Sequence, residues 1–251
     1  FMSLYTIVDG FFVSRYVGAD ALSAINIVYP LIGLAVGIGI MLGTGGSAVI
    51  ARQLGIGEGE EARKNFTRIL LFGLIVGILF TVICTVFLEP LLKLMGASDR
   101  LMGYCREYML VLLPFMAPQL LQTTLGVLFV TAGKPNLGLG LTILSGLANM
   151  VLDYVFIFPL GLGMAGAAFA TGVAPVVSML ILSRHFRRKE NQFHLCRIRP
   201  SLKRIRDISA LGVSALIVEV SSGIVMIVFN FLILKDSGNL GVAAYGILAN
   251  I

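Results

Sequence analysis

The sequence predicts an all-α membrane protein, a bundle of helices that crosses the bilayer several times, and three observations lead to this fold class. Hydrophobic residues make up 57% of the chain and charged residues only 13%, whereas a soluble domain carries about 25% charged residues. The mean hydropathy is +0.95. The 29 glycines are typical of membrane helices, in which small residues let backbones approach closely.

Apolar runs of helical length follow one another along the chain. About 20 such residues form a helix that crosses the hydrocarbon core of a bilayer. We expect helices at about residues 1–17, 21–49, 66–88, 104–132, 137–158, 164–186, 208–234 and from 242 onward. The first and last runs look truncated, so we expect a piece of a longer protein.

Glycine and proline positions add detail to these helices. The pairs Gly33/Gly37, Gly39/Gly43 and Gly73/Gly77 have the GxxxG spacing that predicts close helix packing. Four prolines fall inside predicted helices, where the lost backbone hydrogen bond permits a kink: Pro30, Pro114, Pro118 and Pro175.

An internal repeat suggests two lobes. The stretch "FFVSRYVGADALSAINI" from Phe11 aligns with "FLILKDSGNLGVAAYGI" from Phe231. Six predicted helices separate the copies, so both start on the same membrane face, as in a parallel repeat. We therefore expect a six-helix N-lobe with a basic loop in residues 1–200, and the first one to two helices of a second lobe in residues 201–251.

Most of the 19 Lys and Arg residues fall in one set of alternate loops, above all in 184–206. The positive-inside rule predicts that this face is cytoplasmic, with the N-terminus on the same side, in a cell inner (plasma) membrane. Because the basic residues lie between apolar runs, they do not indicate a nucleic-acid partner.

Motifs for enzyme chemistry are absent from the sequence. It has no P-loop, nucleophile elbow or metalloprotease pattern. Its cysteines, Cys84, Cys105 and Cys196, have neither disulfide-framework nor metal-ligand spacing. We expect no enzyme and no cofactor.

Three carboxylates fall within predicted membrane spans: Asp9, Asp153 and Glu219. A charge at the centre of a membrane helix costs at least about 2.5 to 3.5 kcal/mol, and such residues usually face a bundle interior or a wet cavity. One interpretation is a structural hydrogen bond between helices. The other is a site for a proton or a metal cation.

Asp153 has polar neighbours that favour the second interpretation. Asn149 lies four residues earlier on the same helix face. Thr171 belongs to the next helix, and the short connection makes the two helices antiparallel neighbours. Carboxylate, amide and hydroxyl oxygens suit a small hard cation. The residues therefore predict a site for Na⁺ or H⁺.

Three stretches carry a family likeness: "YTIVDGFFVSRYVGADALSA", "IARQLGIGEGEEARKNF" and "TAGKPNLGLGLTILSGLANMVLDYVFIFPLGLGMAGAAFAT". They resemble the multidrug and toxic compound extrusion (MATE) family, in particular its DinF-like prokaryotic branch. The resemblance covers essentially the whole chain. It implies twelve helices in two lobes, and export of cationic or amphipathic drugs driven by Na⁺ or H⁺.

The resemblance also implies roles for individual residues. Asp9, Asn149, Asp153 and Thr171 match the family's N-lobe cation site. Tyr5 matches a tyrosine one turn before the first aspartate, and Glu219 stands where other members place a glutamate of a substrate or second cation site. We expect a monomer with small-molecule drugs or metabolites and the lipid bilayer as partners.

Two alternatives remain open at this point. One is a lipid-linked oligosaccharide flippase of the same superfamily, whose cavity would need basic residues for pyrophosphate. The intramembrane acids favour cationic substrates instead. The other is a membrane receptor or scaffold that transports nothing, against which the repeat and the paired acids count. Beside these two, a channel also remains open, which single-channel currents would reveal.

Overall fold

The computed structural model describes the backbone of residues 2–187, 194–198 and 201–249, and the side chains of 8–181, 194–198, 201–236, 241 and 245. In this part all regular structure is helical, which confirms the predicted fold class. The helices are α1 (Met2–Tyr16), α2 (Ala19–Gly55), α3 (Gly59–Val86), α4 (Leu88–Leu94), α5 (Asp99–Leu112), the 3₁₀ helix η1 (Leu113–Phe115), α6 (Met116–Thr131), α7 (Pro135–Ile157), α8 (Gly163–Arg187) and α9 (Leu202–Ala249).

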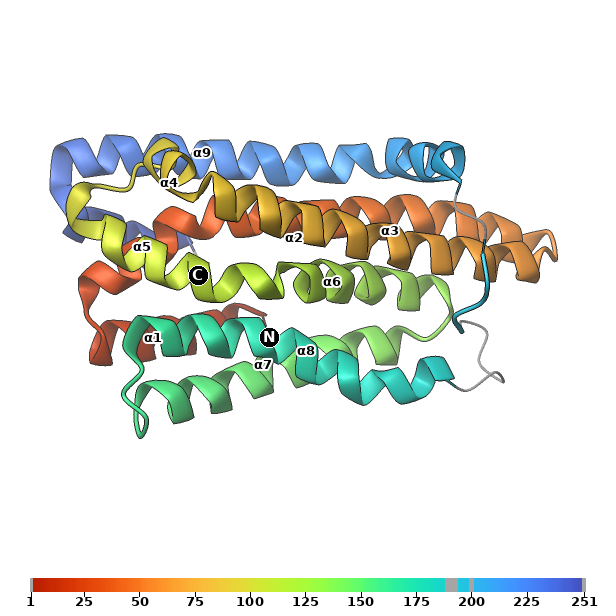
Figure 1. Ribbon diagram of the computed structural model, residues 1–251, viewed down its shortest axis with the longest axis horizontal. Helices are drawn as coiled ribbons and strands as arrows, with labels where there is room; N and C mark the ends of the chain where they lie inside the picture. The colour runs from red at the N-terminus through yellow and green to blue at the C-terminus, as the bar shows by residue number, and fades with distance from the viewer. Residues whose placement is uncertain (1, 188–193, 199–200, 250–251) are drawn as a thin grey trace.

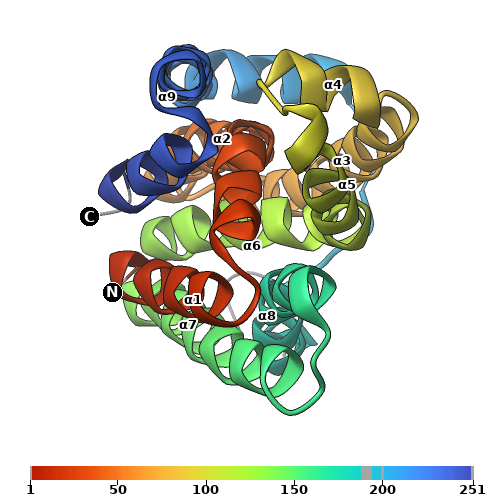
Figure 2. The same ribbon diagram turned by 90° about the vertical axis from the view of Figure 1, so that its left-hand side faces the viewer.

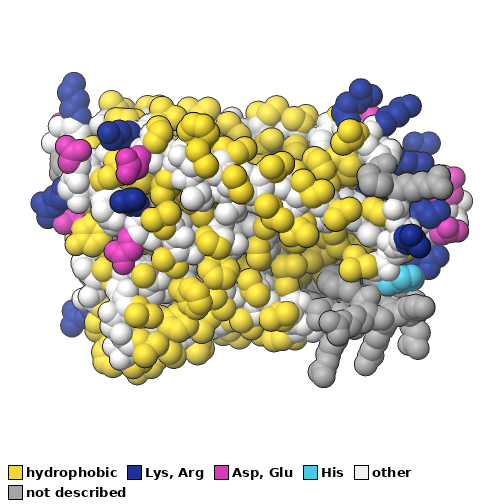
Figure 3. Space-filling model, in the orientation of Figure 1, with side chains coloured by type: hydrophobic (Ala, Val, Ile, Leu, Met, Phe, Trp, Pro, Cys, Tyr) yellow, Lys and Arg dark blue, Asp and Glu magenta, His cyan; other side chains and the backbone are white. Residues whose placement is uncertain are grey.

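The long helices run roughly side by side along one axis (Figure 1). Within the described residues, six segments are long and apolar enough to cross a membrane: Ala19–Gly55, Gly59–Val86, Asp99–Thr131, Pro135–Ile157, Gly163–Ile181 and Leu202–Asp236. On the face shown in Figure 3, a band of hydrophobic side chains separates two charged rims. This band is the surface that a bilayer's hydrocarbon core would cover.

Helix boundaries differ from the predicted ones where polar residues extend a helix. α3 begins at Gly59 and not near 66, because Lys64 pairs with Glu60 at 2.7 Å and with Glu61 at 3.1 Å along one helix face. Hydropathy marks the membrane-contacting part of a helix and misses such polar turns. The sequence also missed α4, a short helix that buries Leu88 and Leu92.

Proline has different effects at different positions. Pro114 lies in η1, a 3₁₀ segment that separates α5 from α6, so the regular α-helix is interrupted there. Pro118 lies in the first turn of α6, where its missing N–H costs no helical hydrogen bond. Pro30 and Pro175 remain inside α2 and α8 without ending either helix.

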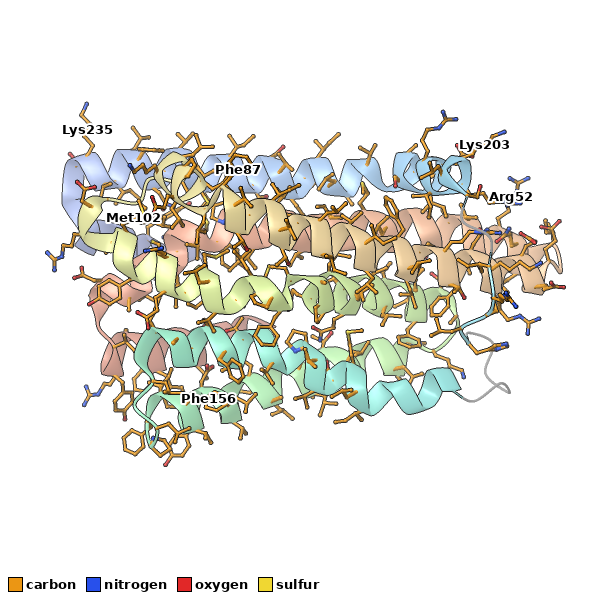
Figure 4. All side chains as sticks on the ribbon, viewed as in Figure 1. Arg52, Phe87, Met102, Phe156, Lys203 and Lys235 are labelled. Atoms are coloured by element: carbon orange, nitrogen blue, oxygen red, sulfur yellow. The ribbon has the colours of Figure 1, made fainter. Side chains whose placement is uncertain are left out.

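The end of the chain departs from prediction. The apolar pattern predicts a break between 234 and 242, but one continuous helix, α9, runs from Leu202 to Ala249. Figure 1 shows that α9 bends before it ends, so that its last part runs back toward the bundle, beyond the end marked by Lys235 in Figure 4.

The predicted glycine pairs mostly pack closely. A Cβ on Gly39 or Gly43 would lie 2.8 Å from α6 atoms, and one on Gly77 would lie 2.6 Å from Ala117. Gly33 is the exception, with open space around it. The sequence does not predict the closest approach: α2 and α9 meet at Gly45 and Gly212, where an added Cβ on either would collide with the other helix's backbone.

Candidate functional site

Two polar residues of α7 and one of α8 meet inside the bundle. The side chain of Asp153 is fully buried, and Asn149, one turn earlier, is 4% exposed. Asn149 Nδ2 donates a hydrogen bond to Thr171 Oγ1 of α8 at 3.4 Å. The structure thus brings Asn149 and Thr171 together as the spacing and the short connection predicted.

Asp9 reaches the same place from α1, which packs along α7 (Figure 2). Its carboxyl group is partly buried, with Oδ1 inaccessible to solvent. It lies within electrostatic reach of the Asp153 carboxyl group. Asp9, Asn149, Asp153 and Thr171 form the group that we call the four-residue site.

Several buried oxygen atoms of this site lack hydrogen-bond partners in the described part of the chain. Asp9 Oδ1, Asn149 Oδ1 and both carboxyl oxygens of Asp153 accept no hydrogen bond from any described residue. A buried polar atom left unsatisfied costs about 1 to 3 kcal/mol, and more if it is charged. Such atoms call for a specific explanation, and oxygen donors of this kind fit a proton or a hard cation such as Na⁺.

A row of aromatic rings on α1 and α7, which we did not predict, flanks the site. The ring centroids of Phe12 and Tyr154 are 6.3 Å apart, and those of Tyr16 and Phe158 are 5.3 Å apart. Stacked pairs within each helix complete the row. A signal for this row was present in the sequence. Phe12 and Tyr16 are four residues apart, as are Tyr154 and Phe158, so each pair lies on one helix face. The row holds α1 against α7 beside the acids.

The other two predicted site residues are placed differently. Glu219 lies on α9 and faces α2. A Cβ added to Gly37 of α2 would be 2.8 Å from the Cβ of Glu219. It therefore belongs to a different helix pair from Asp9 and Asp153. Tyr5 lies in α1, and its side chain is outside the described residues.

A buried amide pair links α2 to α9. Asn26 Nδ2 donates to Asn230 Oδ1 at 3.4 Å, and these side chains are 4% and 1% exposed. No pattern in the sequence connects two asparagines so far apart in the chain. Together with Gly45 and Gly212, the pair fixes α9 against α2.

The sequence profile described as MatE matches residues 1–155, which is more than half of the chain. The chain belongs to the MATE family. The resemblance noted from the three stretches is thereby confirmed, and the chain is part of a multi-pass membrane protein of a transporter family rather than of an enzyme family.

Curated MATE relatives match nearly the whole chain. The multidrug export protein MepA of Staphylococcus saprophyticus is 26% identical over 246 residues, which cover 97% of this chain and 54% of MepA. MepA of Staphylococcus aureus (strain MRSA252) is 24% identical over 248 residues, with the same two coverages. The chain therefore spans about half the length of these relatives.

Solved structures of MATE transporters have the same fold. An inward-facing multidrug resistance transporter of the MOP superfamily superposes with a TM-score of 0.91 at 27% identity, over 98% of this chain and 56% of that one. DinF-BH in complex with rhodamine 6G superposes with a TM-score of 0.93 at 26% identity, over 99% and 56%.

Proposed function

We propose that the full-length protein is a secondary active multidrug exporter, which moves cationic or amphipathic compounds out of the cell in exchange for Na⁺ or H⁺. The MepA relatives are multidrug export proteins, and DinF-BH binds rhodamine 6G. The buried acids of this lobe favour positively charged substrates. We further propose a monomer in the plasma membrane, with the N-terminus and the basic rim on the cytoplasmic side.

The coupling cation is proposed to bind at Asp9, Asn149, Asp153 and Thr171. The observation that carries this assignment is the set of four buried oxygen atoms without hydrogen-bond partners. The two carboxyl groups supply negative charge, and Asn149 supplies an amide oxygen. The Thr171 hydroxyl oxygen has two lone pairs. It can coordinate the cation with one while the other accepts the hydrogen bond from Asn149. Tyr5 and Glu219 are proposed to serve the substrate or a second cation site.

Exchange requires the cation and the drug to favour different arrangements of the helices, because a ligand shifts an equilibrium only by its differential affinity for the two states. Three separate helices contribute to the four-residue site, so cation binding changes how α1 sits against α7 and α8. The drug is proposed to favour the arrangement without the cation.

The decisive experiment measures rhodamine 6G efflux by the full-length protein in proteoliposomes under a Na⁺ gradient or a proton gradient imposed separately. We expect one gradient to drive efflux, and Asp153→Asn to remove the response. Asp20→Asn is the matched control, because Asp20 contacts Arg100 at 2.7 Å on the charged rim. Gradient-driven efflux that Asp153→Asn leaves intact contradicts the cation site, and efflux without any gradient contradicts exchange.

A further inference from the structure

An open groove lies between α3 and the first turns of α9, at the charged rim that carries Lys203 and Arg52 (Figure 4). It has a volume of about 570 Å³ and is lined by Phe72, Leu202, Lys203, Ile205, Arg206 and Ser209. A smaller hollow of about 100 Å³ shares Phe72, Leu202 and Ile205 with it. We call the two together the α3–α9 groove.

The groove has a basic part and an apolar part. Arg68, Lys203 and Arg206 belong to its lining, and no acidic residue does among those described. The apolar wall includes Leu71, Ile75 and Leu202, which are 43%, 47% and 82% exposed. Leu71 and Ile75 continue along α3 into the hydrophobic band, so apolar surface leads from the basic rim toward the middle of the span.

The positive charge of the groove is only partly balanced by nearby acids. Glu61 contacts Arg68 and Arg204 at 3.8 Å and 3.6 Å, besides Lys64. Asp207 lies 3.7 Å from Arg206, and these two side chains are 56% and 79% exposed. Lys203 is exposed as well. The basic face is therefore accessible to an anionic group from outside the helix bundle.

We propose that the α3–α9 groove binds an anionic phospholipid of the leaflet at the basic rim. The phosphate and headgroup contact Lys203 and Arg206, and an acyl chain lies along Phe72, Leu71 and Ile75. Basic pockets between membrane helices on the cytoplasmic side bind anionic headgroups in this manner. A soluble anion does not account for the apolar wall, and an uncharged lipid does not account for the basic lining.

The position of the groove gives the bound lipid a structural role. α3 lies early in the chain and α9 follows α8 near its end, so the groove joins segments that are far apart in the sequence. A lipid that contacts both helices stabilises their arrangement at this rim, alongside the ion pair of Glu61 with Arg204.

The test uses a fluorescent reporter in the groove. The chain contains no tryptophan, so Phe72→Trp in the full-length protein adds a local signal, and the protein without the substitution supplies the background. The protein is placed in phosphatidylcholine vesicles with a minor fraction of brominated phosphatidylglycerol, or of brominated phosphatidylcholine at the same fraction. Bromine quenches the reporter whenever a brominated lipid contacts it, so stronger quenching by phosphatidylglycerol than by phosphatidylcholine at the same fraction reports preferential occupation of the groove. Leu202→Trp is a second reporter in case Phe72→Trp disturbs folding.

We expect phosphatidylglycerol to quench in clear preference to phosphatidylcholine. Lys203→Gln/Arg206→Gln should reduce the preference by about fivefold for each basic residue removed. The control pair Arg52→Gln/Arg63→Gln removes the same charge from α2 and α3 outside the groove and should preserve the preference. The proposal is overturned by equal quenching by both lipids, by no quenching by either, or by an equal loss of preference in the control pair.

Discussion

Two clusters of buried polar residues in this chain differ in how their hydrogen bonds are satisfied. At the four-residue site, four buried oxygen atoms have no partner among the described residues. At the basic rim, Asn65 is fully buried, donates to Gln53 Oε1 at 3.0 Å and accepts from Arg68 at 2.7 Å. The rim cluster is complete within the chain, whereas the four-residue site is completed only by something that the described chain does not supply. We therefore expect the first to contribute to stability, and we propose that the second binds the coupling cation.

The largest expected effect is at Asp153. Asp153→Asn should reduce gradient-driven rhodamine 6G efflux to background, because the amide carries no charge to bind the cation. Stability should stay the same or rise, because a buried carboxyl without a partner is replaced by a neutral group. Efflux and thermal unfolding of the purified full-length protein measure the two effects. A strong loss of stability would instead assign Asp153 a structural role.

The opposite result is expected at Asn65. Asn65→Ala removes two hydrogen bonds and leaves Gln53 and Arg68 without these partners, which should lower the free energy of unfolding by about 1 to 3 kcal/mol. Efflux per folded molecule should stay unchanged. Ser14→Ala is the control, because it removes an exposed hydroxyl bonded to the carbonyl of Phe11. If Asn65→Ala instead reduced efflux without lowering stability, the rim cluster would have a functional role like that proposed for the four-residue site, and the two clusters would not differ as expected.

Thr171 tests a single oxygen of the four-residue site. Thr171→Val keeps the shape of the side chain but removes the hydroxyl that accepts from Asn149. A lost neutral hydrogen bond or ligand of this kind costs about 1 kcal/mol, so the apparent affinity for the coupling cation should fall about fivefold. The readout is the cation concentration that half-saturates efflux. Thr171→Ser retains the oxygen and should stay near the wild-type value, and equal behaviour of both variants would exclude the hydroxyl as a ligand.

The smallest effect is expected at Glu61. Glu61→Gln weakens ion pairs to Arg68 and Arg204 on a partly exposed surface, where such pairs contribute less than about 1 kcal/mol. The loss of stability should disappear in concentrated salt, which screens these charges. Glu60→Gln is the control, because Glu60 is 76% exposed and pairs within α3 with Lys64. A loss of stability that persists in concentrated salt would contradict this expectation, because it would mean that these ion pairs are shielded from the solvent.

The sequence by itself determined most of the fold and the grouping of three residues of the four-residue site. Hydropathy located the membrane spans, because water-free surroundings admit only long apolar helices. The spacing of Asn149 and Asp153 placed both on one helix face, and the short connection to α8 placed Thr171 nearby. The cost of a charge in a bilayer identified Asp9 as a residue with a specific role, and only the family resemblance grouped it with Asp153.

Only the tertiary structure decided how distant segments meet. It placed Asp9 beside Asp153, joined Asn26 to Asn230 and brought Gly45 against Gly212. It also formed the α3–α9 groove from residues that look like ordinary loop and lipid-facing positions. The physical reason is that local periodicity fixes the face of a helix on which a residue lies. The partner of that face depends on side-chain packing between helices, which no spacing along the chain encodes.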